Sequence, residues 1–224
     1  METEYKGNGI SSGTTIVAIE YDDGVVIAAD SRTSCQNYVS NRLADKLTRI
    51  TDNIYCCRSG SASQTQALAK EVSSLMNHLE IAMGEPMLVS DAALTFRNHI
   101  YRNRSSKITS VIVAGWDKRK GGQVYSVPVS GLCIREPFSV AGSGSTYIQG
   151  FVTSQYYPGM PLDETVALAI DAVKLAIGHD CSSGGVVRIG IIDREGIKTG
   201  IICKHESDIS QVTNKVMWNL EFGQ

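Results

Sequence analysis

Thr14 is the first residue whose surroundings could support nucleophilic chemistry. The first twelve residues are polar and lack periodicity, and Gly13-Thr14-Thr15 leads directly into a hydrophobic segment. Two interpretations are open: residues 1–13 are an ordinary amino-terminal tail, or the chain is cleaved after Gly13 and Thr14 becomes a new amino terminus. A threonine hydroxyl needs a base, and an amino-terminal threonine can supply its own α-amine, directly or through a water.

Asp30 and Lys46 could form an ion pair, since one ends a hydrophobic segment and the other begins one. At neutral pH an α-amine with a pKa of about 7.7 to 8.0 is roughly a tenth deprotonated, whereas a lysine near 10.4 is below about a thousandth. The amine is therefore the better base, and Lys46, kept cationic by Asp30, would favour the developing alkoxide. Lys46 as the base and an exposed ion pair worth under about 1 kcal/mol are the alternatives.

Arg58 is the cation whose position most needs an explanation. It follows Cys56 and Cys57 in an otherwise apolar segment. A guanidinium in such a segment requires a partner or access to water, and a substrate carboxylate is one such partner.

Charge and composition exclude several classes of function. Lys and Arg number 21 against 23 Asp and Glu, a net charge of −2, so no excess of positive charge favours nucleic acid or an acidic membrane. No apolar run approaches the roughly 18 residues of a membrane helix, and the first residues lack a secretory signal. We expect a soluble, intracellular protein.

The cysteines and histidines do not form a local metal motif. Six cysteines are too few for a disulfide scaffold, and the adjacent Cys56 and Cys57 are expected to be reduced thiols of the core. No C-x-x-C pair occurs, and the four histidines are scattered along the chain. We expect neither a metal nor a cofactor.

Hydrophobic patterns predict the elements that must position these residues. Strands are expected at 15–21, 25–30, 46–50, 54–59, 109–116, 123–129, 132–135, 186–192 and 197–203, and helices at about 61–84, 88–100, 144–154 and 162–177. Ser61 to Gln64 fits a capping box at the start of the first helix. The basic run at 118–122 is expected to be a hairpin loop. The continuously apolar segment 25–29 predicts a sheet covered on both faces. This order favours a single α+β domain with two helix pairs outside two stacked antiparallel sheets.

Six motifs in the same order resemble a β subunit of the 20S proteasome, from Thr14 to near the carboxyl end. They are Gly13-Thr14-Thr15-Ile16, Ala29-Asp30-Ser31-Arg32-Thr33, Asp45-Lys46-Leu47, Cys57-Arg58-Ser59-Gly60-Ser61, Gly142-Ser143-Gly144-Ser145 and Asp180-Cys181-Ser182-Ser183-Gly184-Gly185. Within that family the sequence is most similar to the subunit type called β1, which has caspase-like activity, through 56–62 and Ala114-Gly115-Trp116-Asp117. The resemblance implies the four-layer αββα sandwich of N-terminal nucleophile hydrolases.

The resemblance also implies a site. Residues 1–13 correspond to a propeptide removed on maturation, and 14–224 to the hydrolase domain. The residues that match the catalytic set are Thr14 as nucleophile, Asp30 and Lys46 as the charged pair, Gly60 as the oxyanion-hole N–H, and Ser143, Asp180 and Ser183 as orienting groups. Those that match the substrate-binding set are Thr33, Ser34, Ala44, Arg58 and Ala62. Because Arg58 and Gly60 are two apart in a strand, both should face the reacting carbonyl, which predicts cleavage after acidic residues.

The expected function is that of a threonine endopeptidase in the stacked-ring 20S particle. Its partners would be the other α and β subunits and unfolded polypeptides, in the cytoplasm and nucleus, for ATP- and ubiquitin-dependent degradation by the 26S particle. Two alternatives remain open at this point. One is an unprocessed structural subunit of the same ring, and the other is a related hydrolase of small amides.

Overall fold

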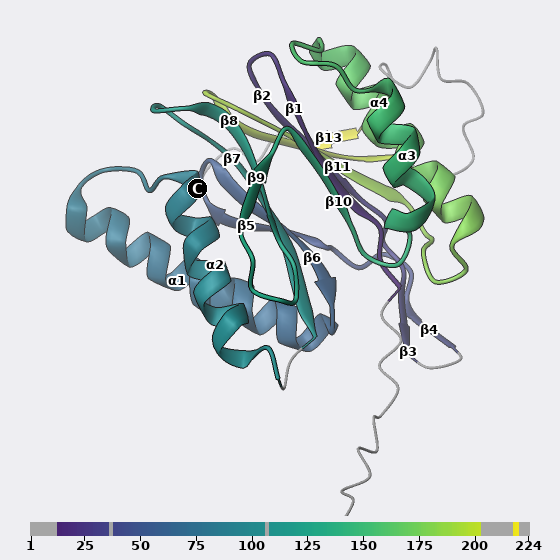
Figure 1. Cartoon of the computed structure of the whole chain (residues 1–224), viewed down its shortest axis with the longest axis horizontal. Coiled ribbons are helices and arrows are strands. Elements are labelled where there is room, and N and C mark those ends of the chain that lie inside the picture. Colours follow the sequence, from purple (N-terminus) through teal and green to yellow (C-terminus); the bar gives the residue numbers. More distant parts are fainter. Residues whose placement is uncertain (1–12, 36–37, 106–107, 203–216, 220–224) are drawn as a thin grey trace, which may run out of the picture.

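Two antiparallel sheets form the centre of the protein. The computed structural model describes residues 13–35, 38–105, 108–202 and 217–219. The six-stranded sheet has the order β10 (Phe138–Ala141), β1 (Ile16–Tyr21), β2 (Gly24–Ala29), β11 (Val187–Asp193), β12 (Gly196–Ile202) and β13 (Met217–Asn219). The five-stranded sheet has the order β5 (Leu47–Thr51), β6 (Ile54–Gly60), β7 (Thr109–Asp117), β8 (Gly121–Val127) and β9 (Ile134–Glu136). A separate hairpin, β3 (Thr33–Cys35) and β4 (Tyr38–Asn41), projects beside them (Figure 1).

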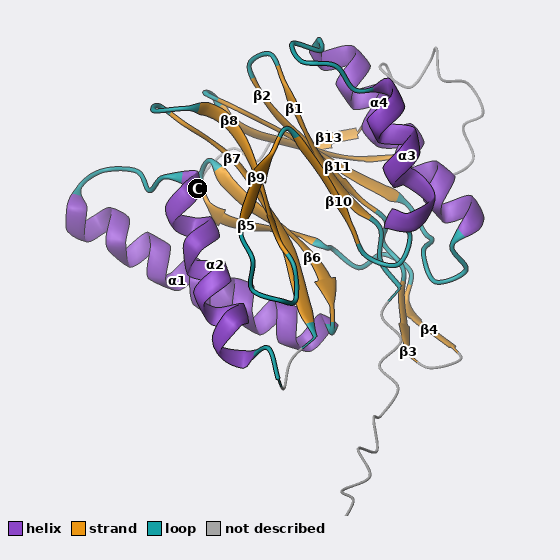
Figure 2. Cartoon of the chain, viewed as in Figure 1, coloured by secondary structure: helices purple, strands orange, loops and turns teal. Residues whose placement is uncertain are grey.

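A pair of helices covers the outer face of each sheet. Helices α1 (Ala62–Met83) and α2 (Val89–Asn103) pack on the five-stranded sheet. Helices α3 (Ser145–Gln155) and α4 (Leu162–His179) pack on the six-stranded sheet. Figure 2 shows the two helical layers on opposite sides of the strands. The prediction of a four-layer αββα sandwich is confirmed.

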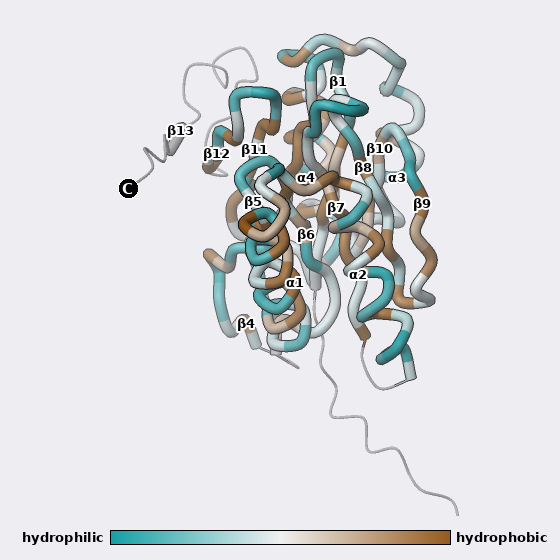
Figure 3. Tube along the Cα trace, turned by 90° about the vertical axis from the view of Figure 1, so that its left-hand side faces the viewer, coloured by the Kyte–Doolittle hydropathy of each residue, from teal (hydrophilic) through white to brown (hydrophobic). Residues whose placement is uncertain are grey.

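Alternating side chains fill three hydrophobic layers. In β1, Val17 and Ile19 pack toward α3 and α4, whereas Ile16 and Ala18 face the other sheet. This follows from the two-residue period of a strand. The segment 25–29 alternates in the same way and is fully buried, so the prediction of a sheet covered on both faces is confirmed. In Figure 3, α1 carries both hydrophobic and hydrophilic residues, as a helix with one buried face should.

The predicted capping box does not form. A capping box requires the Gln64 side chain to accept a hydrogen bond from the backbone N–H of Ser61. That N–H instead donates to the carbonyl of Ile108 at 3.2 Å, and the Ser61 side chain makes no cap hydrogen bond to the helix. Gln64 Oε1 has no hydrogen-bond partner in the described part of the chain.

Two local predictions from the sequence are confirmed, and four strands escaped notice. Residues 118–120 form the turn between β7 and β8, and Cys56 and Cys57 are buried free thiols. Strands β3, β4, β10 and β13 have only three or four residues each, too few to give a recognisable alternation. Among the described residues, no helix is both long and apolar enough to span a membrane.

Candidate active site

The nucleophile candidate lies where β1 begins and β2 ends. Antiparallel pairing sets Ile16 opposite Ala29, which brings Thr15 and Asp30 together at the same edge of the sheet. The backbone N–H of Thr15 donates to Asp30 Oδ1 at 2.9 Å, and the N–H of Asp30 donates to the Thr15 carbonyl at 3.1 Å. Thr14 is buried directly before this pair, with 3% of its surface exposed.

Lys46 and Asp30 form a buried ion pair. Lys46 Nζ lies 2.6 Å from Asp30 Oδ1, and the two side chains are 8% and 0% exposed. The alternative of an exposed ion pair is therefore wrong. Burial lowers the pKa of Lys46 below its ordinary value, although the charge and hydrogen bond of Asp30 act against this shift. A lowered pKa makes the neutral amine of Lys46 easier to form, which favours the alternative in which Lys46 is the base.

Lys46 also contacts the peptide bond before Thr14. Its ammonium donates to the carbonyl oxygen of Gly13 at 2.9 Å. The Thr14 hydroxyl donates to the same oxygen at 2.7 Å. The carbonyl of the Gly13-Thr14 bond is thus polarised by a cation and lies beside a hydroxyl.

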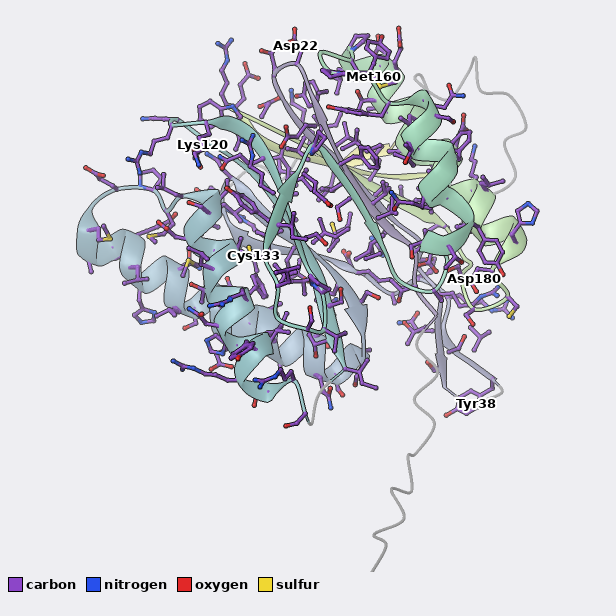
Figure 4. The ribbon with its side chains drawn as sticks, viewed as in Figure 1. Asp22, Tyr38, Lys120, Cys133, Met160 and Asp180 are labelled. Carbon is purple, nitrogen blue, oxygen red and sulfur yellow. The ribbon has the colours of Figure 1, made fainter. Side chains whose placement is uncertain are left out.

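Asp180 organises the other side of Thr14. It follows α4, at the opposite end of that helix from Met160 (Figure 4). Its Oδ2 accepts hydrogen bonds from Ser143 at 2.7 Å and Ser183 at 2.6 Å. Burial acts to raise the pKa of Asp180, but these hydroxyl bonds, a backbone N–H and the charge of Lys46 outweigh it and lower the pKa.

The two serines that bind Asp180 also contact Thr14 and Thr15. The backbone N–H of Thr14 donates to Ser143 Oγ at 3.1 Å, and Ser143 Oγ lies 3.3 Å from the Thr14 carbonyl oxygen. The hydroxyls of Thr15 and Ser183 are 2.8 Å apart. The structure therefore brings together six of the seven residues predicted as catalytic through a continuous set of hydrogen bonds.

A pocket of about 920 Å³ opens beside Thr14, between α1 and the edge of the five-stranded sheet. The seventh predicted residue, Gly60, lines it together with Thr33, Ala44, Arg58 and Ala62. Ser34 is not among the lining residues, and the strand register shifts between Thr33 and Ser34. The pocket extends along α1 past Gln66, Lys70 and Ser73 to Asn77, farther than the sequence suggested.

Arg58 is held within this pocket without being saturated. Its Nε donates to Thr48 Oγ1 at 2.7 Å, and its Nη2 donates to the carbonyl of Asp45. A guanidinium has five N–H groups, and among the described residues two of them are used, which leaves three for a ligand or water. Sequence reasoning missed both partners, as well as Thr15, whose position next to the nucleophile was the available signal.

Comparison with known proteins identifies the family. The family described as proteasome subunit matches residues 10–192. The chain is 42% identical to proteasome subunit beta type-6 of Dictyostelium discoideum over 89% of this chain and 93% of that protein. It is 42% identical to the probable proteasome subunit beta type-1 of Schizosaccharomyces pombe, covering 86% and 85%. It is 43% identical to proteasome subunit beta type-9 of Bos taurus, covering 88% and 90%. With this fold and these matches, the chain belongs to the proteasome subunit family.

Proposed function

We propose that this chain is a catalytic subunit, a threonine endopeptidase that cleaves peptide bonds after acidic residues once residues 1–13 have been removed. One observation carries the proposal: the carbonyl oxygen of Gly13 accepts hydrogen bonds from both Lys46 Nζ, at 2.9 Å, and the Thr14 hydroxyl, at 2.7 Å. A purely structural subunit would have no need to bury a lysine against the bond that precedes a threonine.

Release of residues 1–13 is proposed as an intramolecular acyl shift. The Thr14 oxygen forms a bond to the carbonyl carbon of Gly13, and Lys46 stabilises the negative charge on the carbonyl oxygen. The bond from this carbon to the Thr14 nitrogen then breaks, and the hydroxyl proton is transferred in net terms to that nitrogen. Water hydrolyses the resulting ester, which frees the α-amine of Thr14 and the carboxylate of Gly13.

The mature reaction repeats these steps on a substrate. The Thr14 hydroxyl loses its proton to the free α-amine, directly or through a water, and attacks the substrate carbonyl. The amine half of the substrate leaves, and water hydrolyses the acyl-enzyme. Ser143, which contacts the Thr14 nitrogen at 3.1 Å in the uncleaved chain, would orient the free amine.

Arg58 supports the proposed preference for acidic residues. Its three remaining N–H groups can bind a carboxylate with charge-assisted hydrogen bonds. An apolar side chain in the same place would remove water from the guanidinium and offer it no hydrogen bond in return.

A second candidate is an unprocessed structural subunit of the same particle. The comparisons support it more directly than the catalytic reading, because the names of the relatives state a subunit and no activity. In either case we propose that the chain assembles with other α and β subunits in the 20S particle, in the cytoplasm and nucleus.

Mass spectrometry of the chain purified in its particle distinguishes the two. We expect the first residue to be Thr14, and we expect the variant Thr14→Ala to keep residues 1–13 and to lose cleavage after Glu while still assembling. Two results together would overturn the catalytic proposal and favour the structural subunit. The chain in the particle would begin at Met1, and the particle would cleave after Glu equally well with and without the Thr14→Ala change.

A further inference from the structure

Arg32 links the two halves of the candidate site, although no step above uses it. Its guanidinium Nη1 donates to the carbonyl of Cys181 at 3.1 Å. Its backbone N–H donates to Asp30 Oδ2, also at 3.1 Å. One residue therefore contacts both the carboxylate that pairs with Lys46 and the loop that carries Asp180.

The segments 30–32 and 181–184 are joined by further hydrogen bonds. The N–H of Gly184 donates to Asp30 Oδ2 at 2.9 Å, and the N–H of Ser31 donates to the Gly184 carbonyl at 3.0 Å. Both of these bonds lie at the far end of the loop, at residue 184. The Arg32 guanidinium contacts the near end of the loop, at Cys181, the residue directly after Asp180.

The lack of a side chain at Gly184 makes room for the Arg32 guanidinium. A Cβ atom built on Gly184 would lie 2.3 Å from Arg32 Cζ and 2.4 Å from its Nε. Gly184 is not among the glycines with positive φ, so its backbone would accept alanine if the guanidinium were elsewhere. The absence of a side chain at residue 184 thus leaves the space that the guanidinium occupies beside the loop.

We propose that Arg32 is a positioning residue for the threonine site, fixing the 180–184 loop so that Asp180 keeps Ser143 and Ser183 at hydrogen-bond distance. The proposal rests on the proposed function, because it assigns a purpose to that same site. Arg32 does not line the pocket that contains Arg58. Its loss should therefore affect the rate of the reaction and leave substrate affinity unchanged.

Loss of the Arg32 contact should also change the pH dependence. Asp180 is held ionised by the serine hydroxyls, a backbone N–H and the charge of Lys46, which is itself paired with Asp30. His179 precedes Asp180 at the end of α4 and stacks on Tyr147 at a centroid distance of 6.0 Å. Loosening the loop weakens the hydrogen bonds to the carboxylate, which raises the pKa of Asp180 toward its ordinary value.

The test measures kcat, KM and the pH profile of the assembled particle on a peptide with Glu before the cut. For Arg32→Ala we expect kcat to fall about 10- to 100-fold, because a misplaced group of this kind costs up to about 10². KM should stay within about twofold, and the acid limb of the profile should move to higher pH. Arg97→Ala is the matched control, since Arg97 also bridges to a loop carbonyl, that of Gly131 at 3.3 Å, on the α2 side of the molecule.

Gly184→Ala gives a second, independent variant. It keeps Arg32 and displaces only the guanidinium, so it should reproduce the loss of kcat and the shifted acid limb. The double variant with Arg32→Ala should be no slower than the slower single variant, since both changes break the same contact. If Arg32→Ala fails to assemble, the kcat and the pH profile of Gly184→Ala alone decide the proposal.

Hydrogen exchange of segment 180–184 separates this proposal from the proposed function. An inactive wild type whose 180–184 amides exchange faster in Arg32→Ala would overturn the proposed activity and keep the positioning role. An active wild type with unchanged kcat, pH profile and exchange in both variants would overturn the positioning role and keep the activity.

Discussion

Lys46 donates a hydrogen bond from its ammonium to the carbonyl oxygen of Gly13, at 2.9 Å, while the same nitrogen lies 2.6 Å from Asp30. The cation is therefore already in contact with a carbonyl before any substrate arrives. On the proposed function, the carbonyl attacked by Thr14 in the mature chain would take the place of the Gly13 carbonyl. The same ammonium would then serve both reactions.

Replacing Lys46 should slow both the release of residues 1–13 and the turnover of substrate. Removing one preorganised electrostatic group from such a site costs about 10² to 10³ in rate. Lys46→Ala should therefore lose turnover to that degree, and Lys46→Arg should fail as well because its planar guanidinium is larger than the ammonium. The rate is measured on chains expressed from Thr14 onward behind a removable leader, which separates turnover from self-release. Lys198→Ala, on the exposed side of β12, is the control; wild-type turnover in Lys46→Ala would contradict the mechanism.

Gly13→Ala should slow the release of residues 1–13. A Cβ on Gly13 would lie 1.9 Å from the backbone carbonyl oxygen of Ser182, so either the scissile bond or the 180–184 loop must move. The measurement is the fraction of uncleaved chain against time after assembly. Gly150→Ala is the matched control, because a Cβ there meets nothing within 4 Å. Equal rates of release for the two variants would show that the close contact is irrelevant to cleavage.

Arg58→Met should shift the preference of the pocket from acidic to apolar side chains. The variant removes the cation and keeps much of the bulk, so cleavage after Glu should fall and cleavage after Leu should rise. We expect the ratio of the two kcat/KM values to change about tenfold or more, since a hydrogen bond to a charged group contributes about 1.5 to 3 kcal/mol. Arg135→Met, whose guanidinium pairs with Glu20, controls for the loss of one cation. An unchanged ratio would mean that Arg58 serves only to hold Thr48 and Asp45.

The pKa of Asp180 predicts a loss of stability in acid. Because the folded protein holds this pKa below its ordinary value, the ionised carboxylate stabilises the fold above a pH of about 4. That contribution disappears as the pH falls through the pKa of the folded state. Asp180→Asn should therefore be less stable than the wild type at pH 6, with the difference shrinking at pH 3. Urea unfolding at both pH values is the measurement, and a difference that grows in acid would refute the assignment.

The sequence predicted the layers of the fold because their hydrophobic periods are long and regular. Leu68, Val72, Leu75 and Met76 of α1 have helical spacing, and the continuously apolar segment 25–29 of β2 indicates a strand buried on both faces. The hairpin of β3 and β4 escaped prediction because β4 is exposed along its whole length, so no buried face marks it. The capping box was wrong because a residue distant in sequence, Ile108, binds the N–H that the motif would have used.

The candidate site was also predicted only in part. The resemblance to the proteasome family placed Thr14, Asp30 and Lys46 in one centre, which agrees with their contacts, although their catalytic roles stay predictions. Register-dependent contacts could not be foreseen: Thr48 pairs across from Cys56 and so comes within reach of Arg58. The contact of Arg32 with Cys181 spans 149 positions and has no local signature.

The hydrogen bonds around the threonines have a consequence for timing during synthesis. Thr15 and Ser183 are 168 positions apart, and Thr14 and Ser143 are 129 apart. At about 5 to 20 residues per second, roughly 8 to 34 seconds separate the translation of the first threonine from that of the last serine. On the proposed function, the hydroxyl stays inert throughout this interval, because its surroundings do not yet exist. Self-cleavage would therefore act as a checkpoint, so that a truncated or misfolded chain never becomes a free protease.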